Sequence, residues 1–215
     1  MEIVLRVLLF THILFGVLAL TSGCAAIAVK KGGKTHRLAG KIFFYSMLGV
    51  TASAFIISVA KNNGFLLMIA VFSFYQNYMG YRAIKNKGLI PSSLDWMVLF
   101  CAAVNTFFMI WSMNIVLMVF GGISLFLVLG NLRINLKTKR KEVLHPLRWL
   151  KLHIGMMMGA YIAAITAFVV VNAGIFAFLN LPEWLPWLLP TLILVPLMGY
   201  LTKKYTVKTV GKPGN

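Results

Sequence analysis

The sequence contains four histidines, and two of them lie inside long apolar runs. His12 lies in the first run and shares one helical stripe with Gly16, Ala19 and Gly23; His153 lies one turn into the sixth run. Paired histidines on neighbouring helices can ligate haem b, and small residues beside them admit the macrocycle. Metal or haem binding by His12 and His153 is therefore one hypothesis. The alternative for His12 is that it hydrogen-bonds across a seam between helices.

A second group of polar side chains gathers in one half of the expected helices. It consists of His36, Arg37, Gln76, Asn77, Arg82 and His153. Gln76 and Asn77 are too short to reach water from inside a membrane, and an unpartnered buried polar group costs about 1–3 kcal/mol. We therefore expect these six residues to form a ligand site, with His153 on the wall of a cavity that opens to the cytoplasm between the first, second, third and sixth helices. The alternative is that they are interface residues whose polar ends reach the headgroups.

The carboxylates argue against two classes of membrane protein. The four acids are Glu2, Asp95, Glu142 and Glu183, and all lie at the ends of apolar runs or between them. Ion-coupled transporters usually need a carboxylate within a span, and metal-dependent membrane hydrolases tend to use one. We therefore expect the basic groups of the site to be balanced by lipid phosphate, a bound anion, helix C-terminal carbonyls or water.

The elements that must position these residues are seven apolar runs. They cover 3–29, 38–60, 65–84, 96–112, 115–135, 149–172 and 185–202. Hydrophobic residues make up 60% of the chain and charged residues 12%, whereas a soluble domain has about 25% charged residues. About 20 apolar residues span one bilayer. The sequence therefore predicts an all-α, polytopic bundle of seven transmembrane helices over 1–205, followed by a short basic tail, 206–215.

The basic residues predict the orientation of this bundle. Of the 21 lysines and arginines, all but Arg6 and Lys61 fall in or beside the odd-numbered connections and the C-terminal tail. Because basic loops stay in the cytoplasm, we predict an outside N-terminus and a cytoplasmic C-terminus. The net charge of +17 then indicates contact with anionic lipid headgroups, not nucleic acid, because no separate basic domain exists to bind it.

Four short stretches resemble a known family. They are His12-x3-Gly16, Lys31–Gly40, His153–Asn172 and Trp187-x2-Pro190-Thr191. Together they are similar to a family of predicted bacterial membrane proteins that is catalogued as a domain of unknown function. The resemblance implies a small helical protein of the bacterial cytoplasmic membrane and implies no activity. It adds weight to His12, His36, Arg37 and His153 as positions to test.

Three functions remain open at this point, and we assign no catalytic residues. The first is an accessory protein, or a subunit of a larger membrane complex, with a polar His/Arg-containing site in its cytoplasmic half. The second is a redox protein that resembles a b-type cytochrome. The third is a carrier or sensor for a small anionic or amphipathic ligand.

Overall fold

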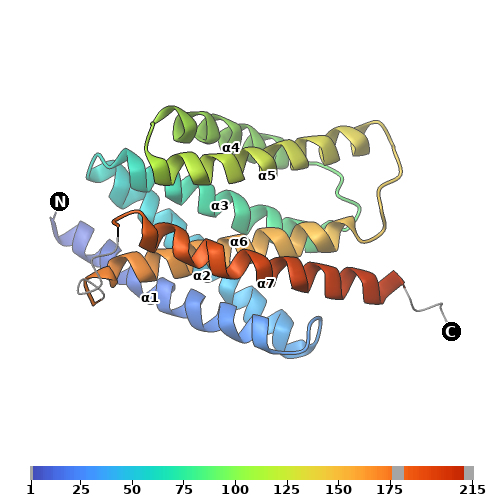
Figure 1. Cartoon of the computed structure of the whole chain (residues 1–215), viewed down its shortest axis with the longest axis horizontal. Helices are drawn as coiled ribbons and strands as arrows, with labels where there is room; N and C mark the ends of the chain where they lie inside the picture. Colours follow the sequence, from blue (N-terminus) through green and yellow to red (C-terminus); the bar gives the residue numbers. More distant parts are fainter. Residues whose placement is uncertain (1, 176–181, 211–215) are drawn as a thin grey trace.

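A computed structural model of the chain describes residues 2–175 and 182–210, and its regular structure is helical throughout (Figure 1). The α-helices are α1 (Glu2–Ala28), α2 (Lys34–Ala60), α3 (Gly64–Lys85), α4 (Ser93–Trp111), α5 (Ile115–Lys139), α6 (Arg148–Val171) and α7 (Leu185–Val210). No strand occurs among the described residues. Each predicted apolar run is thus a helix, and the all-α prediction is confirmed.

Local sequence signals fix where several helices begin. The Ser92 side chain caps α4 and exchanges hydrogen bonds with Asp95, which forms a capping box. The Asn63 and Asn114 side chains cap α3 and α5 in the same way, by accepting hydrogen bonds from backbone N–H groups of the first turn. Polar residues between the apolar runs therefore satisfy backbone donors that would otherwise lack partners.

The helix ends differ from prediction most at α7. The apolar run ends at residue 202, yet α7 continues to Val210. An apolar surface is needed only within a membrane, so a helix can continue into water with polar residues. The predicted boundary between the bundle and the tail 206–215 accordingly falls inside α7, and residues 211–215 lie outside the described residues.

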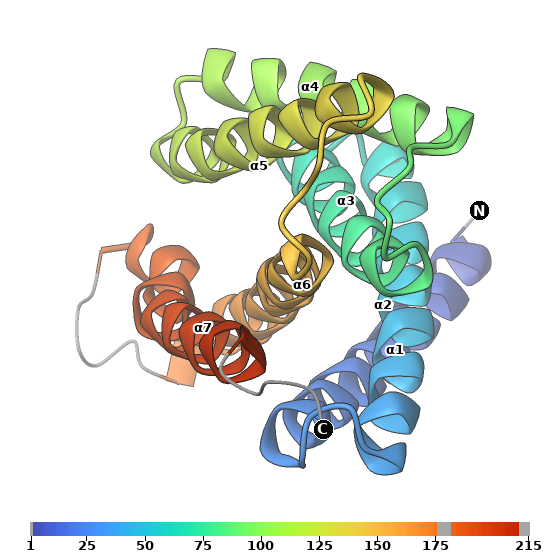
Figure 2. The ribbon, with the colours of Figure 1, turned by 90° about the vertical axis from the view of Figure 1, so that its right-hand side faces the viewer.

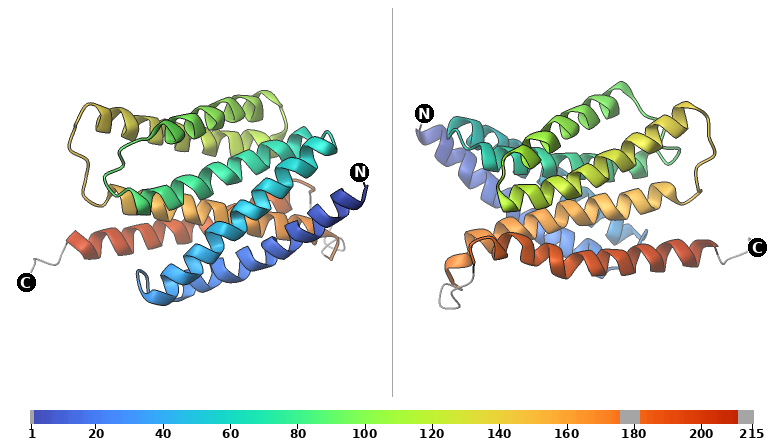
Figure 3. Two further views of the ribbon diagram at one scale, coloured as in Figure 1. Left: turned by 180° about the vertical axis from the view of Figure 1, so that it is seen from behind. Right: turned by 45° about the horizontal axis from the view of Figure 1, so that its top comes forward.

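Consecutive helices run antiparallel, and the two termini lie at opposite ends of the bundle (Figure 1). The connections α1–α2, α3–α4 and α5–α6 and the end of α7 share one end, which we call the basic end (Figure 3). Helix α3 packs against α2, α4, α5 and α6, and α6 also packs against α1 and α7. Figure 2 views the bundle from the basic end and shows α3 and α6 at its centre.

Six of the described helices are long and apolar enough to cross a membrane, and α3 is not among them. Helix α1 leaves most of its apolar surface uncovered, including Ile3, Phe10 and Val17. In water such a surface would be costly, whereas in a bilayer it faces lipid chains of similar polarity. The chain is therefore a multi-pass membrane protein. Helix α3 is less apolar because it carries the polar residues described next.

Candidate functional site

Both histidines within apolar helices contact a neighbouring helix. Nδ1 of His12 lies 3.0 Å from the Ser53 hydroxyl and 3.2 Å from the Val50 carbonyl oxygen, both on α2. Nδ1 of His153 lies 2.9 Å from the Gly80 carbonyl oxygen on α3. His12 thus makes the seam contact that was the alternative to metal or haem binding, and His153 makes a similar contact with α3. The described part of the chain contains no group of three or more His, Cys, Asp or Glu side chains that could hold a metal ion.

His36 and Arg37 lie at the α1–α2 turn and bond to backbone carbonyls. Nδ1 of His36 is 2.9 Å from the Ala26 carbonyl oxygen, and Nε of Arg37 donates to the Gly32 carbonyl at 2.9 Å. Carbonyls at a helix C-terminus carry partial negative charge and attract cations. Ala26 lies in the last turn of α1, whereas Gly32 lies in the connection to α2, so only the His36 contact uses a helix C-terminal carbonyl.

Lys31 also contributes hydrogen bonds to the connection between α1 and α2. Its Nζ donates to the Ala26 carbonyl at 3.0 Å and also to the Ile27 carbonyl. Partial burial lowers the pKa of Lys31, and the positive charge of Lys204 near the end of α7 lowers it further. The end of α7 therefore adds positive charge to the α1–α2 turn.

Gln76 and Asn77 are almost completely buried, as expected, but they face different neighbours. Asn77 is 0% exposed, and its Nδ2 donates to the Phe44 carbonyl on α2 at 3.0 Å. Gln76 instead packs on α6 at Gly159, where a Cβ would lie 1.7 Å from Gln76 Oε1. Gly159 therefore leaves the space that the Gln76 carboxamide fills. Both residues avoid lipid, but they do not share one site.

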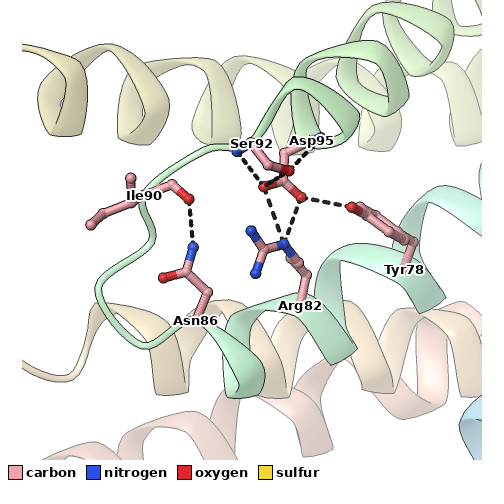
Figure 4. Close-up of polar contacts among 6 residues, drawn as sticks. All are labelled: Tyr78, Arg82, Asn86, Ile90, Ser92 and Asp95. Carbon is pink, nitrogen blue, oxygen red and sulfur yellow. Dashed lines mark hydrogen bonds and ion pairs between the residues drawn. The ribbon is translucent and has the colours of Figure 1, made fainter.

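Arg82 is paired with a carboxylate, so one expectation was wrong. Its Nε donates to both carboxylate oxygens of Asp95 at 2.9 and 3.1 Å (Figure 4). Ser92, through its N–H and hydroxyl, and the Tyr78 hydroxyl donate to the same carboxylate. Asp95 lies at a helix end, as predicted, but it is also 3% exposed. The helix end turns this acid inward, so Arg82 needs no counter-ion from outside the chain.

The predicted cavity with His153 on its wall is replaced by a cavity elsewhere. A cavity of about 430 Å³ lies between α3, α5, α6 and α7, and we call it the α6 groove. Of the six predicted site residues only Gln76 lines it. The other five lie in the contacts described above, because α3 and α6 pack tightly where the site was expected. A ligand-binding role for those five stays a prediction.

The α6 groove is apolar along most of its length and basic at one end. Arg148 and Lys151, in the first turn of α6, line its basic end, and Thr166 lines it 18 residues further along the same helix. At 1.5 Å per residue the groove therefore extends about 27 Å along α6. Its polar lining includes two hydroxyls, of Thr166 and Thr191, that are buried without a partner among the described residues.

Sequence reasoning missed most of this groove. Gly155 and Gly159 form a G-x-x-x-G pattern that predicts close packing on both glycines. Only Gly159 has a close neighbour, whereas a Cβ on Gly155 would meet nothing within 4 Å and Gly155 lines the groove. In the sequence, Arg148 and Lys151 were interpreted only as basic residues that set the membrane orientation, not as groove residues. The signal available in the sequence was their position about one and two helical turns before Gly155 on an otherwise apolar helix.

Comparison with known proteins identifies a family but no activity. A search among curated proteins and one among solved structures each found no match. A family model described as "Predicted membrane protein (DUF2306)" matches residues 9–117, from α1 into α5. The match includes His12-x3-Gly16 and the stretch Lys31–Gly40, two of the four stretches that carried the resemblance. The chain therefore belongs to the family of predicted membrane proteins described as DUF2306, a domain of unknown function.

Proposed function

We propose that this protein binds an anionic membrane lipid in the α6 groove and acts as a carrier or sensor for it. The lipid places its phosphate headgroup at Arg148 and Lys151 and lays one chain along the apolar wall toward Thr166. The observation that carries this proposal is the groove itself, which is basic at one end and apolar beyond it, with no carboxylate among its lining residues.

The charges at the basic end of the groove favour an anion. Arg148 and Lys151 are exposed, and the ion pairs among the described residues use other cations. A guanidinium presents a fork of N–H donors that matches phosphate, and an ammonium adds a mobile point charge. A lipid phosphate held between the two side chains would thus receive both charge and directed hydrogen bonds.

The walls of the groove favour a hydrocarbon chain. Phe72, Phe120, Ile162 and Val195 line it from four different helices. Burying apolar surface in a narrow groove gains close packing contacts that fluid lipid does not provide. The groove's length of about 27 Å exceeds the depth of one leaflet, which is about half of the roughly 30 Å thickness of a bilayer core. One chain of a lipid can therefore lie along α6 while its headgroup stays at the interface.

The proposal includes seven membrane spans, with the basic end in the cytoplasm of a bacterium. Among the lysines and arginines that the structure describes, all but Arg6 and Lys61 lie in or beside the connections and helix ends of the basic end, and basic loops are retained in the cytoplasm. The headgroup bound at Arg148 then belongs to the inner leaflet of the cytoplasmic membrane.

Helix α3 serves as the seventh span despite its polarity. Its 22 residues reach about 33 Å at 1.5 Å per residue, enough to cross a bilayer. Its most polar uncharged side chains, Gln76 and Asn77, are buried by neighbouring helices. A span that is surrounded by protein does not need the hydropathy of one that faces lipid.

The test is a lipid titration of the delipidated full-length chain, followed by native mass spectrometry. Phosphatidylglycerol should bind more tightly than zwitterionic phosphatidylcholine, and inorganic phosphate alone should not displace it. Arg148→Gln with Lys151→Gln should remove this preference. Lys139→Gln with Lys141→Gln, two exposed changes outside the groove, serves as the charge-matched control. Equal binding of both lipids, or an unchanged preference in the double variant, would refute the proposal.

A further inference from the structure

A second, much smaller cavity lies beside the Arg82–Asp95 pair. Its volume is about 20 Å³, and its polar lining comes from Arg82 on α3, Asn86 just after α3, Asp95 on α4, and Asn131 and Asn135 on α5. A cavity of roughly 10–15 Å³ on this measure is large enough for one water molecule, provided that two to four polar groups surround it. The cavity therefore has both the size and the polar lining of a buried water site.

Two of the lining side chains have polar atoms without a protein partner. Oδ1 of Asn131 and Nδ2 of Asn135 are buried and make no hydrogen bond to any described residue, and the two residues are 1% and 4% exposed. Buried polar groups are rarely left unpaired, because they lose their bonds to water without replacement. One of these atoms is an acceptor and the other a donor, which is the pair of groups that a single water satisfies.

The neighbouring contacts hold this arrangement in place. Nδ2 of Asn131 donates to the Tyr75 hydroxyl at 2.5 Å, so this amide is already fixed on its other side. Arg82 bonds to Asp95 through Nε alone, and its terminal nitrogens remain as further donors (Figure 4). A water that donates to Asn131 Oδ1 can accept from Asn135 or from the Arg82 guanidinium.

We propose that an internal water molecule occupies this cavity and bridges Asn131 and Asn135 to the Arg82–Asp95 pair. It completes the hydrogen bonding around the Arg82–Asp95 pair and joins α3, α4 and α5 at the basic end. The site is independent of lipid binding, although Asn131 lines both cavities and so places the water directly behind the wall of the α6 groove.

X-ray hydroxyl-radical footprinting tests this site, because radiolysis of a bound water labels buried side chains next to it. Met79 lines the small cavity and is 5% exposed, whereas Met47 is 1% exposed and lines neither cavity. In the full-length protein in lipid nanodiscs, Met79 should be oxidised several-fold faster than Met47.

Asn135→Leu should remove the donor, fill the cavity and bring Met79 down to the rate of Met47. Asn135→Ala, which removes the donor but leaves room for the water beside Arg82, should keep most of the labelling. The proposal is overturned if Met79 in the unaltered protein reacts no faster than Met47. It is equally overturned if a folded Asn135→Leu protein is labelled at Met79 as fast as the unaltered protein.

Discussion

The Arg82 guanidinium on α3 holds the Asp95 carboxylate at the start of α4, with its Nε 2.9 Å from one oxygen and 3.1 Å from the other. The Asp95 side chain is 4% exposed, and that of Arg82 is 30% exposed. Asp95 is also the capping-box residue of α4. Asp95 therefore both caps the start of α4 and neutralises Arg82 on α3. The ion pair holds α4 against α3 at the centre of the bundle.

Removing Arg82 and removing Asp95 should lower the free energy of unfolding by different amounts. Arg82→Gln leaves a buried carboxylate without a counter-charge and should lower the free energy of unfolding by about 3 kcal/mol. Asp95→Asn should cost less, because the Arg82 guanidinium can still reach water. Denaturant unfolding in micelles, followed by tryptophan fluorescence, measures both changes.

Arg140→Gln is the matched control for Arg82→Gln. Arg140 is exposed and its Nη1 lies 3.9 Å from Glu142, so its loss should cost about 0–1 kcal/mol. The combined Arg82→Gln, Asp95→Asn variant should cost less than the sum of the two single changes. If Arg82→Gln is no more destabilising than Arg140→Gln, the pair does not hold α4 in place.

Two glycines on α1 should respond differently to the same substitution. A Cβ on Gly23 would lie 2.4 Å from the Tyr161 ring, which also packs edge-on against Phe43, whereas a Cβ on Gly16 would meet nothing within 4 Å. Gly23→Ala should therefore cost about 1–3 kcal/mol through overpacking. Gly16→Ala should change stability by no more than about 1 kcal/mol, in the favourable direction. Equal effects in thermal unfolding would show that α1 does not pack on α6 at Gly23.

The topology can be tested with reporter fusions. Fusions after Lys61 and Trp184 should report the outside, and fusions after Lys34, Lys87, Lys141 and Gly211 should report the cytoplasm. The critical position is Lys87, because it reads cytoplasmic only if α3 crosses the membrane. An outside signal at Lys87, or a cytoplasmic one at Trp184, would contradict seven spans.

The visible spectrum of the purified protein tests the haem hypothesis. His12 packs against α2 and His153 against α3, and neither lines the α6 groove. We therefore expect protein from haem-replete cells to be colourless. A Soret band that disappears in His12→Ala or His153→Ala would instead show that the protein binds haem and would favour the b-type cytochrome alternative.

The fold was predictable because lipid imposes a simple rule on sequence. Every apolar run of sufficient length became a helix, since backbone groups in a membrane must be paired within the segment. The helix ends were less predictable where polar residues continue a helix, as beyond residue 202 in α7. The burial of Gln76 and Asn77 was also predictable, because short polar side chains cannot reach the interface.

The grouping of the site residues was not predictable from spacing alone. Gln76 and Asn77 are adjacent in sequence, yet one lines a groove beside α6 and the other bonds to α2. The burial of Asp95 was not predictable, because the position of an acid at a helix start does not show whether its side chain faces solvent or a neighbouring helix. The groove arises because α5 and α7 lie apart from each other on either side of α6 (Figure 2). This is a property of helix packing, not of any one stretch of sequence.

The most direct test of the lipid proposal is to block the groove and measure the lipid that remains bound. A Cβ on Gly155 would meet nothing within 4 Å, so Gly155→Leu projects a side chain into the groove. Gly122→Leu makes the same change on α5, where a Cβ would also meet nothing within 4 Å but the residue does not line the groove. Native mass spectrometry of the purified proteins in phosphatidylglycerol should show one tightly retained lipid on Gly122→Leu and on the unaltered protein. It should show none on Gly155→Leu. If Gly155→Leu retains that lipid as fully as Gly122→Leu does, the α6 groove is not a lipid site.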